Sequence, residues 1–141
     1  MSSKKVFVTG GAGFIGSNYV ADLIRRGDEV TIYDNLSRPG VSYNIDWLNH
    51  EFGADAFRLV VGDVRDADKL EKEIGKPDVV AHFAAQVAVT TSVVDPREDF
   101  EINALGTFNV LEAVRKSGTQ PAVLYTSTNK VYGGMEDVRV S

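Results

Sequence analysis

The stretch VFVTGGAGFIGSNYVADLIRRG, residues 6–27, sets four glycines between an apolar run and an amphipathic run. Gly10, Gly13 and Gly16 form the pattern G-x-x-G-x-x-G, with Gly11 beside the first of them. Glycine has no Cβ, so it permits a tight turn with positive φ and lets an anion lie against the backbone N–H groups that begin a helix. The stretch therefore predicts a strand, a glycine turn and a helix whose N-terminus approaches a phosphate.

Short β-branched runs alternate with longer helical patterns along the rest of the chain. Five strands are predicted, at residues 5–9, 29–34, 57–63, 78–84 and 122–128. Helices are predicted at residues 14–26, 41–52, 67–74 and 96–117. Nearly continuous hydrophobic strands with connections too long for hairpins are typical of a parallel sheet covered on both faces. We expect a doubly wound α/β (Rossmann) fold with right-handed crossovers and the strand order 3-2-1-4-5.

Composition and charge exclude several classes of function. A chain of 141 residues, 43% hydrophobic and 25% charged, is typical of one soluble globular domain. Its net charge of −5, without a basic stripe, argues against binding to nucleic acid. There is no cysteine, and His50 and His82 are far apart, so no metal site is predicted. Because the first residues lack the apolar core of a signal peptide and no run is long enough to span a membrane, we expect a cytoplasmic protein.

An acidic residue at the end of the second strand indicates which phosphate compound would bind. Asp34 lies 18 residues after Gly16, near the spacing of about 20 at which dinucleotide-binding domains place an acid for the adenosine ribose. A carboxylate there accepts a hydrogen bond from a ribose hydroxyl and repels a 2′-phosphate, which favours NAD over NADP. Arg38 argues the other way, since an arginine there could partner a phosphate. A solvated loop arginine is the alternative interpretation.

The later strands end in residues that suit the same ligand. The run GDVRD places Asp63 at the edge of the sheet where an adenine would lie, although Asp63 or Asp66 could instead cap a helix. The run HFAAQ ends the fourth strand, and the small side chains of Ala84 and Ala85 would let a cofactor pass close to the backbone. His82 is predicted to be a packed strand residue and not a catalyst.

These motifs together resemble a known family. They are TGGAGFIG, DNL at residues 34–36, GDVRD, HFAAQ, Asn103 in NALGT, and TSTNKVYG, and the resemblance covers Lys5 to Gly133. The chain is similar to the N-terminal part of the extended short-chain dehydrogenases/reductases, the NAD-dependent nucleotide-sugar epimerase and dehydratase family. The resemblance implies NAD as cofactor, bound by Gly10, Gly13, Phe14, Ile15, Gly16, Asp34, Asn35, Arg38, Asp63, Val64, Phe83, Ala84, Ala85, Gln86, Asn103 and Thr126.

Within the family, the runs DNLSRPG, QVAVTTS, DFEINALGTFNVLEAVR and STNKVYG are most similar to the CDP-paratose 2-epimerases. This resemblance implies that NAD takes a hydride from C2 of CDP-paratose and returns it to the other face of a transient 2-keto sugar, giving CDP-tyvelose. Thr128 occupies the family's Ser/Thr position, whose hydroxyl bonds the reacting sugar oxygen. Dehydratases of the family carry an Asp-Glu pair next, where this chain has Asn129 and Lys130, so dehydration is disfavoured. Residues 90–92 could contact the substrate or cap a helix.

The family's proton-transfer pair, Tyr-x-x-x-Lys, is absent from the sequence. The residues four after its five tyrosines are Leu23, Ser37, Trp47, Asn129 and Glu136. We expect this pair, a sixth strand and a substrate domain beyond Ser141, so residues 1–141 are interpreted as the NAD-binding domain of a larger enzyme, inactive by itself.

Other functions and partners stay open at this point. The alternatives are another nucleotide-sugar epimerase, such as a UDP-glucose 4-epimerase, and a free-standing NAD-binding module. The expected partners are a nucleotide-sugar substrate and a second copy of the chain, through helices such as residues 96–117. Neither a membrane nor a nucleic acid is expected.

Overall fold

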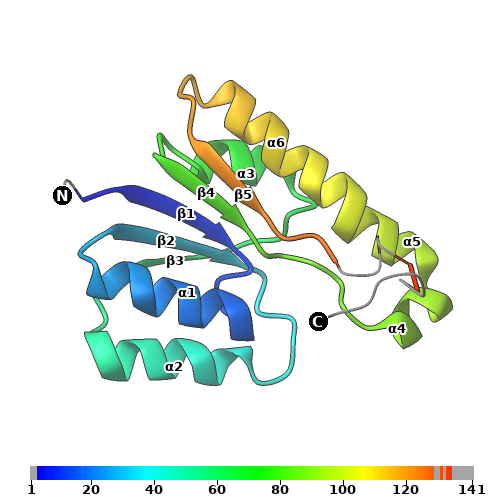
Figure 1. Cartoon of the computed structure of the whole chain (residues 1–141), viewed down its shortest axis with the longest axis horizontal. Coiled ribbons are helices and arrows are strands. Elements are labelled where there is room, and N and C mark those ends of the chain that lie inside the picture. Colours follow the sequence, from blue (N-terminus) through cyan, green and yellow to red (C-terminus); the bar gives the residue numbers. More distant parts are fainter. Residues whose placement is uncertain (1–2, 129–130, 132, 135–141) are drawn as a thin grey trace, which may run out of the picture.

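Five parallel strands form one sheet in the order β3-β2-β1-β4-β5 in the computed structural model, which describes residues 3–128, 131, 133 and 134 (Figure 1). The strands are β1 (Lys5–Thr9), β2 (Glu29–Asp34), β3 (Arg58–Val61), β4 (Val79–His82) and β5 (Ala122–Tyr125). Each hydrogen-bonded neighbour pairs in parallel. The predicted strand order is confirmed, and the last three strands are shorter than predicted.

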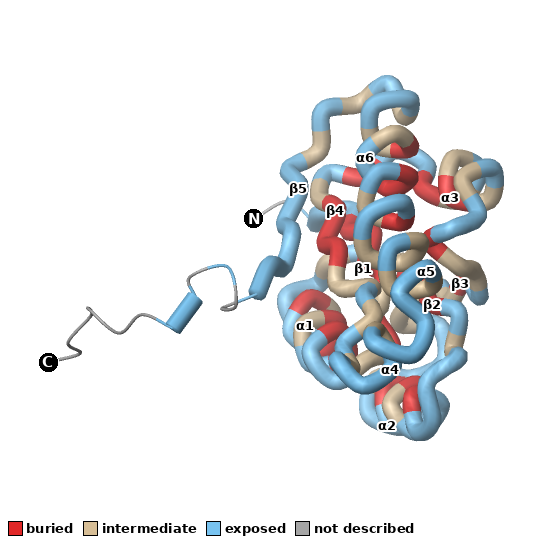
Figure 2. The backbone as a smooth tube through the Cα atoms, turned by 90° about the vertical axis from the view of Figure 1, so that its right-hand side faces the viewer, coloured by how far each residue is buried: buried red, intermediate tan, exposed pale blue. Residues whose placement is uncertain are grey.

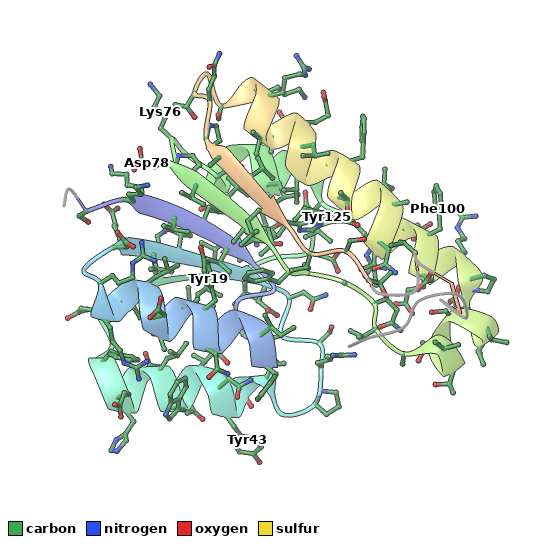
Figure 3. All side chains as sticks on the ribbon, in the orientation of Figure 1. Tyr19, Tyr43, Lys76, Asp78, Phe100 and Tyr125 are labelled. Carbon is green, nitrogen blue, oxygen red and sulfur yellow. The ribbon has the colours of Figure 1, made fainter. Side chains whose placement is uncertain are left out.

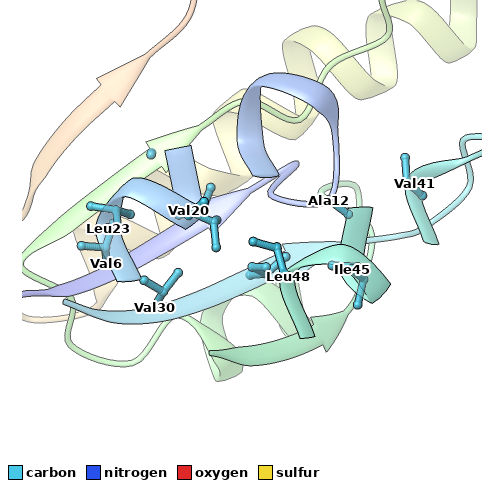
Figure 4. Packing of buried hydrophobic residues seen from close by; sticks show 12 residues of the cluster. Val6, Ala12, Val20, Leu23, Val30, Val41, Ile45 and Leu48 are labelled. Carbon is cyan, nitrogen blue, oxygen red and sulfur yellow. The ribbon is translucent and has the colours of Figure 1, made fainter. Parts of the chain in front are cut away.

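Helices cover both faces of this sheet. The helices α1 (Phe14–Arg25) and α2 (Val41–Phe52) lie on one face, and α3 (Ala67–Glu73) and α6 (Gly106–Lys116) lie on the other (Figure 1). The side chains of β1 alternate between the two layers. Val6 and Val8 pack with α1 and α2 (Figure 4), and Phe7 packs with Tyr33 and the opposite helices, with the two rings 5.7 Å apart. Because successive side chains of a strand point to opposite faces of the sheet, this alternation also decides toward which face the last residues of each strand point.

The helix predicted at residues 96–117 is built from three segments. It begins with α5 (Pro96–Phe100), continues as the π-helix η1 (Glu101–Leu105) and ends as α6. The side chain of Asp95 caps its start by accepting from Glu98 N at 2.9 Å. A π-helical turn inside an α-helix is frequently found at a functional site, and this one lies beside the loop after β4.

A short helix that the sequence analysis did not predict, α4 (Val89–Val94), precedes this long helix. Residues 90–92 lie inside α4, and Ala88 stands at its N-cap position without a side-chain hydrogen bond. The interpretation of residues 90–92 as helix caps is therefore wrong, because α4 already begins at Val89.

The strand β5 forms an edge of the sheet and is exposed along its length (Figure 2). Among the described residues, no helix combines the length and the apolar character needed to cross a bilayer.

Candidate functional site

A cleft of about 370 Å³ opens at the carboxyl edge of the sheet, between β1, β2 and β4. At this point the strand order reverses, which is where open α/β sheets bind their ligands. Its volume is within the range of small-molecule sites, roughly 300–1,000 Å³. Of the predicted cofactor-binding residues, the cleft is lined by Gly10, Gly13, Phe14, Ile15, Gly16, Asp34, Asn35, Arg38, Asp63, Val64, Phe83, Ala84, Ala85, Gln86 and Thr126.

Several lining residues were missed by the sequence analysis. They are Tyr33, Ser37, Val41, Gly62, Val87 and Ile102. Gly62 could have been predicted from the sequence, since it directly precedes Asp63 at the end of a strand. A Cβ on Gly62 would lie 2.5 Å from the Tyr33 ring, whose hydroxyl donates to Asp63 O at 2.9 Å. Tyr33, Ser37 and Val87 are sequence neighbours of predicted residues. Val41, on α2, and Ile102, on η1, are brought to this edge by the fold.

The glycine turn brings two backbone segments into close approach. Gly10 has a φ of +69°, and its N–H donates to Tyr33 O at 2.9 Å. A Cβ on Gly10 would lie 2.5 Å from Ala84 N, and a Cβ on Gly16 would collide with Gly10 O. Both positions therefore require glycine, the first for the contact between β1 and the loop after β4 and the second for the packing of α1 on the turn.

The N-terminus of α1 opens on the cleft with unpaired donors. No side chain of the described residues caps it, and the helix's first backbone bond runs from Ser17 N to Gly13 O at 2.8 Å. The N–H groups of Phe14, Ile15 and Gly16 come before that bond and have no partner within the helix. Together with the positive end of the helix dipole, these donors suit an anionic ligand.

Asp34 and Asn44 hold the peptide groups of Ala12 inside the glycine turn. Asp34 Oδ2 accepts from Ala12 N at 3.0 Å, and Asp34 Oδ1 accepts from Leu36 N at 2.9 Å. Asn44, on α2, donates from Nδ2 to Ala12 O at 2.7 Å. Each carboxylate oxygen keeps a second lone pair, so Asp34 can support the turn and also accept from a ligand. Asn44 was missed, because nothing in the sequence links it to the glycines.

Asp63 is held as an anion at the rim of the cleft. Arg65 donates to both of its oxygens, Nε to Oδ1 at 2.9 Å and NH2 to Oδ2 at 2.8 Å, and Asn35 Nδ2 donates to Oδ2 at 3.0 Å. The hydrogen bonds from Arg65 hold the pKa of Asp63 well below its usual range, against the opposing effect of burial. The N-cap of α3 is Asp66, which accepts from Lys69 N at 3.0 Å, so Asp63 is free of that structural role.

His82 is buried beneath the end of the cleft, as predicted for a packed strand residue. Its Nδ1 lies 2.6 Å from Thr9 Oγ1, and its Nε2 lies 2.9 Å from Thr107 Oγ1. The ring stacks on that of Tyr125, with ring centroids 5.9 Å apart. Tyr125 lies at the end of β5 (Figure 3). Burial lowers the pKa of His82 to about 4, so the imidazole is neutral at physiological pH.

Asn103, predicted to bind the cofactor, lies behind the cleft and holds one of its lining residues. Its Oδ1 accepts from Gln86 N at 2.8 Å, and its Nδ2 donates to Asp99 Oδ1 at 3.0 Å and to Gln86 O at 3.3 Å. A direct contact between Asn103 and a cofactor stays a prediction.

The residues predicted to contact a substrate are only partly described. Thr126, which was predicted to bind the cofactor, lines the cleft just before them and donates from Oγ1 to His82 O at 3.3 Å. Thr128 is an exposed residue two positions further along. Its neighbours in the motif, Asn129 and Lys130, lie outside the described residues. On α4, Ser92 Oγ donates to Asp99 Oδ1 at 2.7 Å. The catalytic role of Thr128 and the substrate contacts of residues 90–92 stay predictions.

The described residues contain no group of three or more side chains placed to hold a metal ion.

Comparison with known proteins shows the family of the chain. Residues 7–141 match the sequence profile of the family described as GDP-mannose 4,6 dehydratase. CDP-paratose 2-epimerase of Salmonella typhi is 43% identical over 137 residues, covering 96% of this chain and 40% of that protein. dTDP-glucose 4,6-dehydratase of Mycobacterium tuberculosis is 38% identical over 134 residues, covering 94% of this chain and 38% of that protein. The chain thus spans about two fifths of the length of these relatives.

A solved structure shows the same architecture. UDP-glucose-4-epimerase from Stenotrophomonas maltophila, with bound NAD and formylated UDP-arabinopyranose, superposes with a TM-score of 0.85 at 32% identity. The match covers 94% of this chain and 39% of that one.

The contact of Gly10 with Ala84 predicts the effect of adding one methyl group. Gly10 and Gly118 both have positive φ, +69° and +73°, but a Cβ on Gly118 meets nothing within 4 Å. We expect Gly118→Ala to cost about 1–2 kcal/mol from the backbone conformation, and Gly10→Ala to cost a further 1–3 kcal/mol or so from the collision. Urea unfolding of both variants measures the difference. Equal losses of unfolding free energy would contradict the close approach.

The buried His82 predicts a loss of stability in mild acid. Its pKa falls from the ordinary 6.5 to about 4 on folding, so the unfolded chain takes up a proton that the folded chain refuses. Stability is therefore full above about pH 6.5 and declines as the pH falls toward 4, by up to about 1.4 kcal/mol per pH unit. Between pH 7.5 and 5, the wild-type chain should lose about 2 kcal/mol more unfolding free energy than His82→Gln. If the unfolding free energies of the two proteins fell equally between pH 7.5 and 5, the prediction would be wrong, because His82 would then take up its proton in the folded chain as well.

Proposed function

The chain belongs to the GDP-mannose 4,6-dehydratase family of extended short-chain dehydrogenases/reductases, and from that premise we propose that its cleft holds NAD as part of a nucleotide-sugar epimerase. The observation that carries this proposal is the meeting of the glycine turn, Asp34 and Asp63 on one cleft at the strand-order reversal. A pyrophosphate, a ribose and a base each need one of these features, and the cleft has all three.

The residues present fit NAD along the length of the cleft. The N–H groups that begin α1 would bind its pyrophosphate, because they are unpaired and lie at the positive end of the helix. Asp34 would accept from the adenosine ribose, and the carboxylate of Asp63 would accept from the adenine amino group. Ala84 and Ala85 would let the nicotinamide end approach the backbone after β4. When bound, NAD supplies a hydride acceptor and donor for the sugar.

NAD is favoured over NADP because Asp34 is buried and negatively charged. Its two oxygens already accept from Ala12 N and Leu36 N, so the side chain cannot turn aside for a 2′-phosphate without releasing the glycine turn. Arg38 lines the cleft, and we assign it to a solvated position beside the ribose.

For the whole protein, we propose epimerisation at C2 of CDP-paratose, giving CDP-tyvelose. The 43% identity to the Salmonella typhi CDP-paratose 2-epimerase supports this reaction. Thr128 would hold the proton of the reacting hydroxyl by donating and accepting at once. A Tyr-x-x-x-Lys pair, which residues 1–141 lack, would come from the rest of the protein and complete the proton transfer.

The likeness to UDP-glucose-4-epimerase favours a second candidate, epimerisation at C4 of a UDP-sugar. Dehydration is disfavoured, although a dTDP-glucose 4,6-dehydratase is 38% identical, because Asn129 and Lys130 stand where dehydratases place an acid and a base.

We further propose a cytoplasmic homo-oligomer. The exposed side chains of Phe100, Phe108 and Leu111 on α5 and α6 support self-association, since they form an apolar surface on one long helix.

Binding of NAD to this chain tests the cofactor proposal. We expect NAD to bind at least tenfold more tightly than NADP, and Asp34→Asn to weaken NAD binding about tenfold, because a hydrogen bond to a charged group is worth roughly 1.5–3 kcal/mol. The affinity for NADP should change less. Calorimetric titration gives both dissociation constants. Asp46→Asn, an exposed change on α2, is the matched control and should bind like the wild type. Equal affinity of the wild-type chain for the two dinucleotides would contradict the proposal.

Turnover of a labelled sugar tests the reaction. The complete protein, given CDP-paratose with deuterium at C2, should yield CDP-tyvelose that retains the label at C2, because the hydride never leaves the site. Thr128→Val should lower kcat about 10²–10⁴-fold without changing the affinity for NAD, whereas Thr31→Val, on β2, should leave kcat unchanged. NMR spectra of the product decide. Conversion of UDP-glucose in place of CDP-paratose would establish the second candidate.

A further inference from the structure

We propose that His82 is a positioning residue for the cofactor site. Held as the neutral Nε2–H tautomer between Thr9 and Thr107, it fixes the cleft wall, by which we mean residues 83–87, the segment after β4 that lines the cleft. This inference rests on the proposed binding of NAD for its functional consequence, but its structural part can be tested without any ligand.

The direction of the hydrogen bonds determines the tautomer. Thr107 Oγ1 lies 2.6 Å from Asn103 O, and a carbonyl oxygen only accepts, so the single hydroxyl proton of Thr107 points to Asn103. Thr107 Oγ1 must therefore accept from His82, whose Nε2 carries the proton. In the neutral ring Nδ1 is then an acceptor, and Thr9 Oγ1 donates to it at 2.6 Å.

The first arm of this chain of hydrogen bonds reaches the cleft wall at Ala84. Thr9 Oγ1 donates its hydrogen bond to His82 and accepts one from Ala84 N at 3.3 Å. Ala84 is the residue whose backbone lies against Gly10. The hydroxyl of Thr9 thus sets the position of the cleft wall relative to the glycine turn, and His82 sets the direction of that hydroxyl.

The second arm reaches the cleft wall at Gln86. From His82 it passes through Thr107 Oγ1 to the carbonyl of Asn103, inside the π-helical segment η1. The side chain of the same asparagine bonds Gln86 on both its N–H, at 2.8 Å, and its carbonyl, at 3.3 Å. Beside the backbone bond from Phe83 N to Thr9 O at 3.0 Å, the cleft wall is therefore held at Ala84 and at Gln86 by bonds that lead to opposite sides of one imidazole ring.

Burial keeps the two arms intact at physiological pH. Thr9 and His82 are 0% and 3% exposed, and burial lowers the pKa of the ring to about 4. A proton on Nδ1 would face Thr9 Oγ1, which would have to give up its donor role while still accepting from Ala84. With the neutral ring, every donor in this series of hydrogen bonds has an acceptor.

The tautomer is measured first, on the wild-type chain. In ¹⁵N NMR spectra of the imidazoles, His82 should show a protonated Nε2 and an unprotonated Nδ1 from pH 7.5 down to 5. A proton on Nδ1 of His82, or a charged ring at pH 6, would overturn the proposal before any variant is made.

Two substitutions of the ring then separate positioning from packing. His82→Phe keeps the ring and removes both bonds, so we expect about tenfold weaker NAD binding and at least tenfold faster amide exchange at Ala84 and Gln86. His82→Gln keeps one acceptor and one donor and should restore most of both. His50→Phe is the control and should alter neither. Should His82→Phe fail to fold, Thr107→Val, which removes one hydroxyl at constant volume, should weaken NAD binding three- to tenfold.

The outcomes distinguish this inference from the proposed function. Tight NAD binding by His82→Phe, or failure of His82→Gln to restore it in a folded protein, would reduce His82 to a packing residue. A wild-type chain that binds no NAD would refute the proposed function instead, while the tautomer and the amide exchange of Ala84 and Gln86 would still decide whether His82 holds the cleft wall.

Discussion

The close approach of Gly10 to the backbone of Ala84 is the contact on which the rest of the site depends. It joins the end of β1 to the segment after β4 with no side chain between them, at the place where the strand order reverses. The cleft lies over this contact, with the N-terminus of α1 on one side and the segment after β4 on the other. A side chain at Gly10 would separate the two strand ends and move both sides of the cleft.

The two carboxylates at the cleft are held by hydrogen bonds from the protein itself. Asp63 is paired with Arg65 and Asn35, and Asp34 accepts from two backbone N–H groups. Each carboxylate is therefore already held in one orientation before a ligand arrives, which reduces the ordering that binding must impose. The N–H groups at the start of α1 have no partner within the helix, and together with the positive end of the helix dipole they favour an anionic group as the ligand.

Most of the fold was predictable because local patterns decide it. Alternating apolar strands and amphipathic helices gave the strand order and the bounds of α2 without error, and the end of α1 to one residue. The helix predicted at residues 96–117 contains the π-helical segment η1, and Asn103 in that segment bonds Gln86 in the loop after β4. The short α4 was missed, because a six-residue run of valine, threonine and serine has little intrinsic helical preference.

By itself, the sequence identified the glycines, Asp34 and Asp63 as candidate ligand-binding residues, and the structure brings them to one cleft. Their signals are local, since a turn, a strand end and a helix start can each be recognised within a few residues. Only the tertiary structure decided which side chains support them. Asn44 reaches Ala12 from α2, and His82 links Thr9, 73 residues before it, to Thr107, 25 residues after it. Hydrogen bonds between segments far apart in sequence depend on how the sheet brings those segments together, and no local pattern encodes that distance.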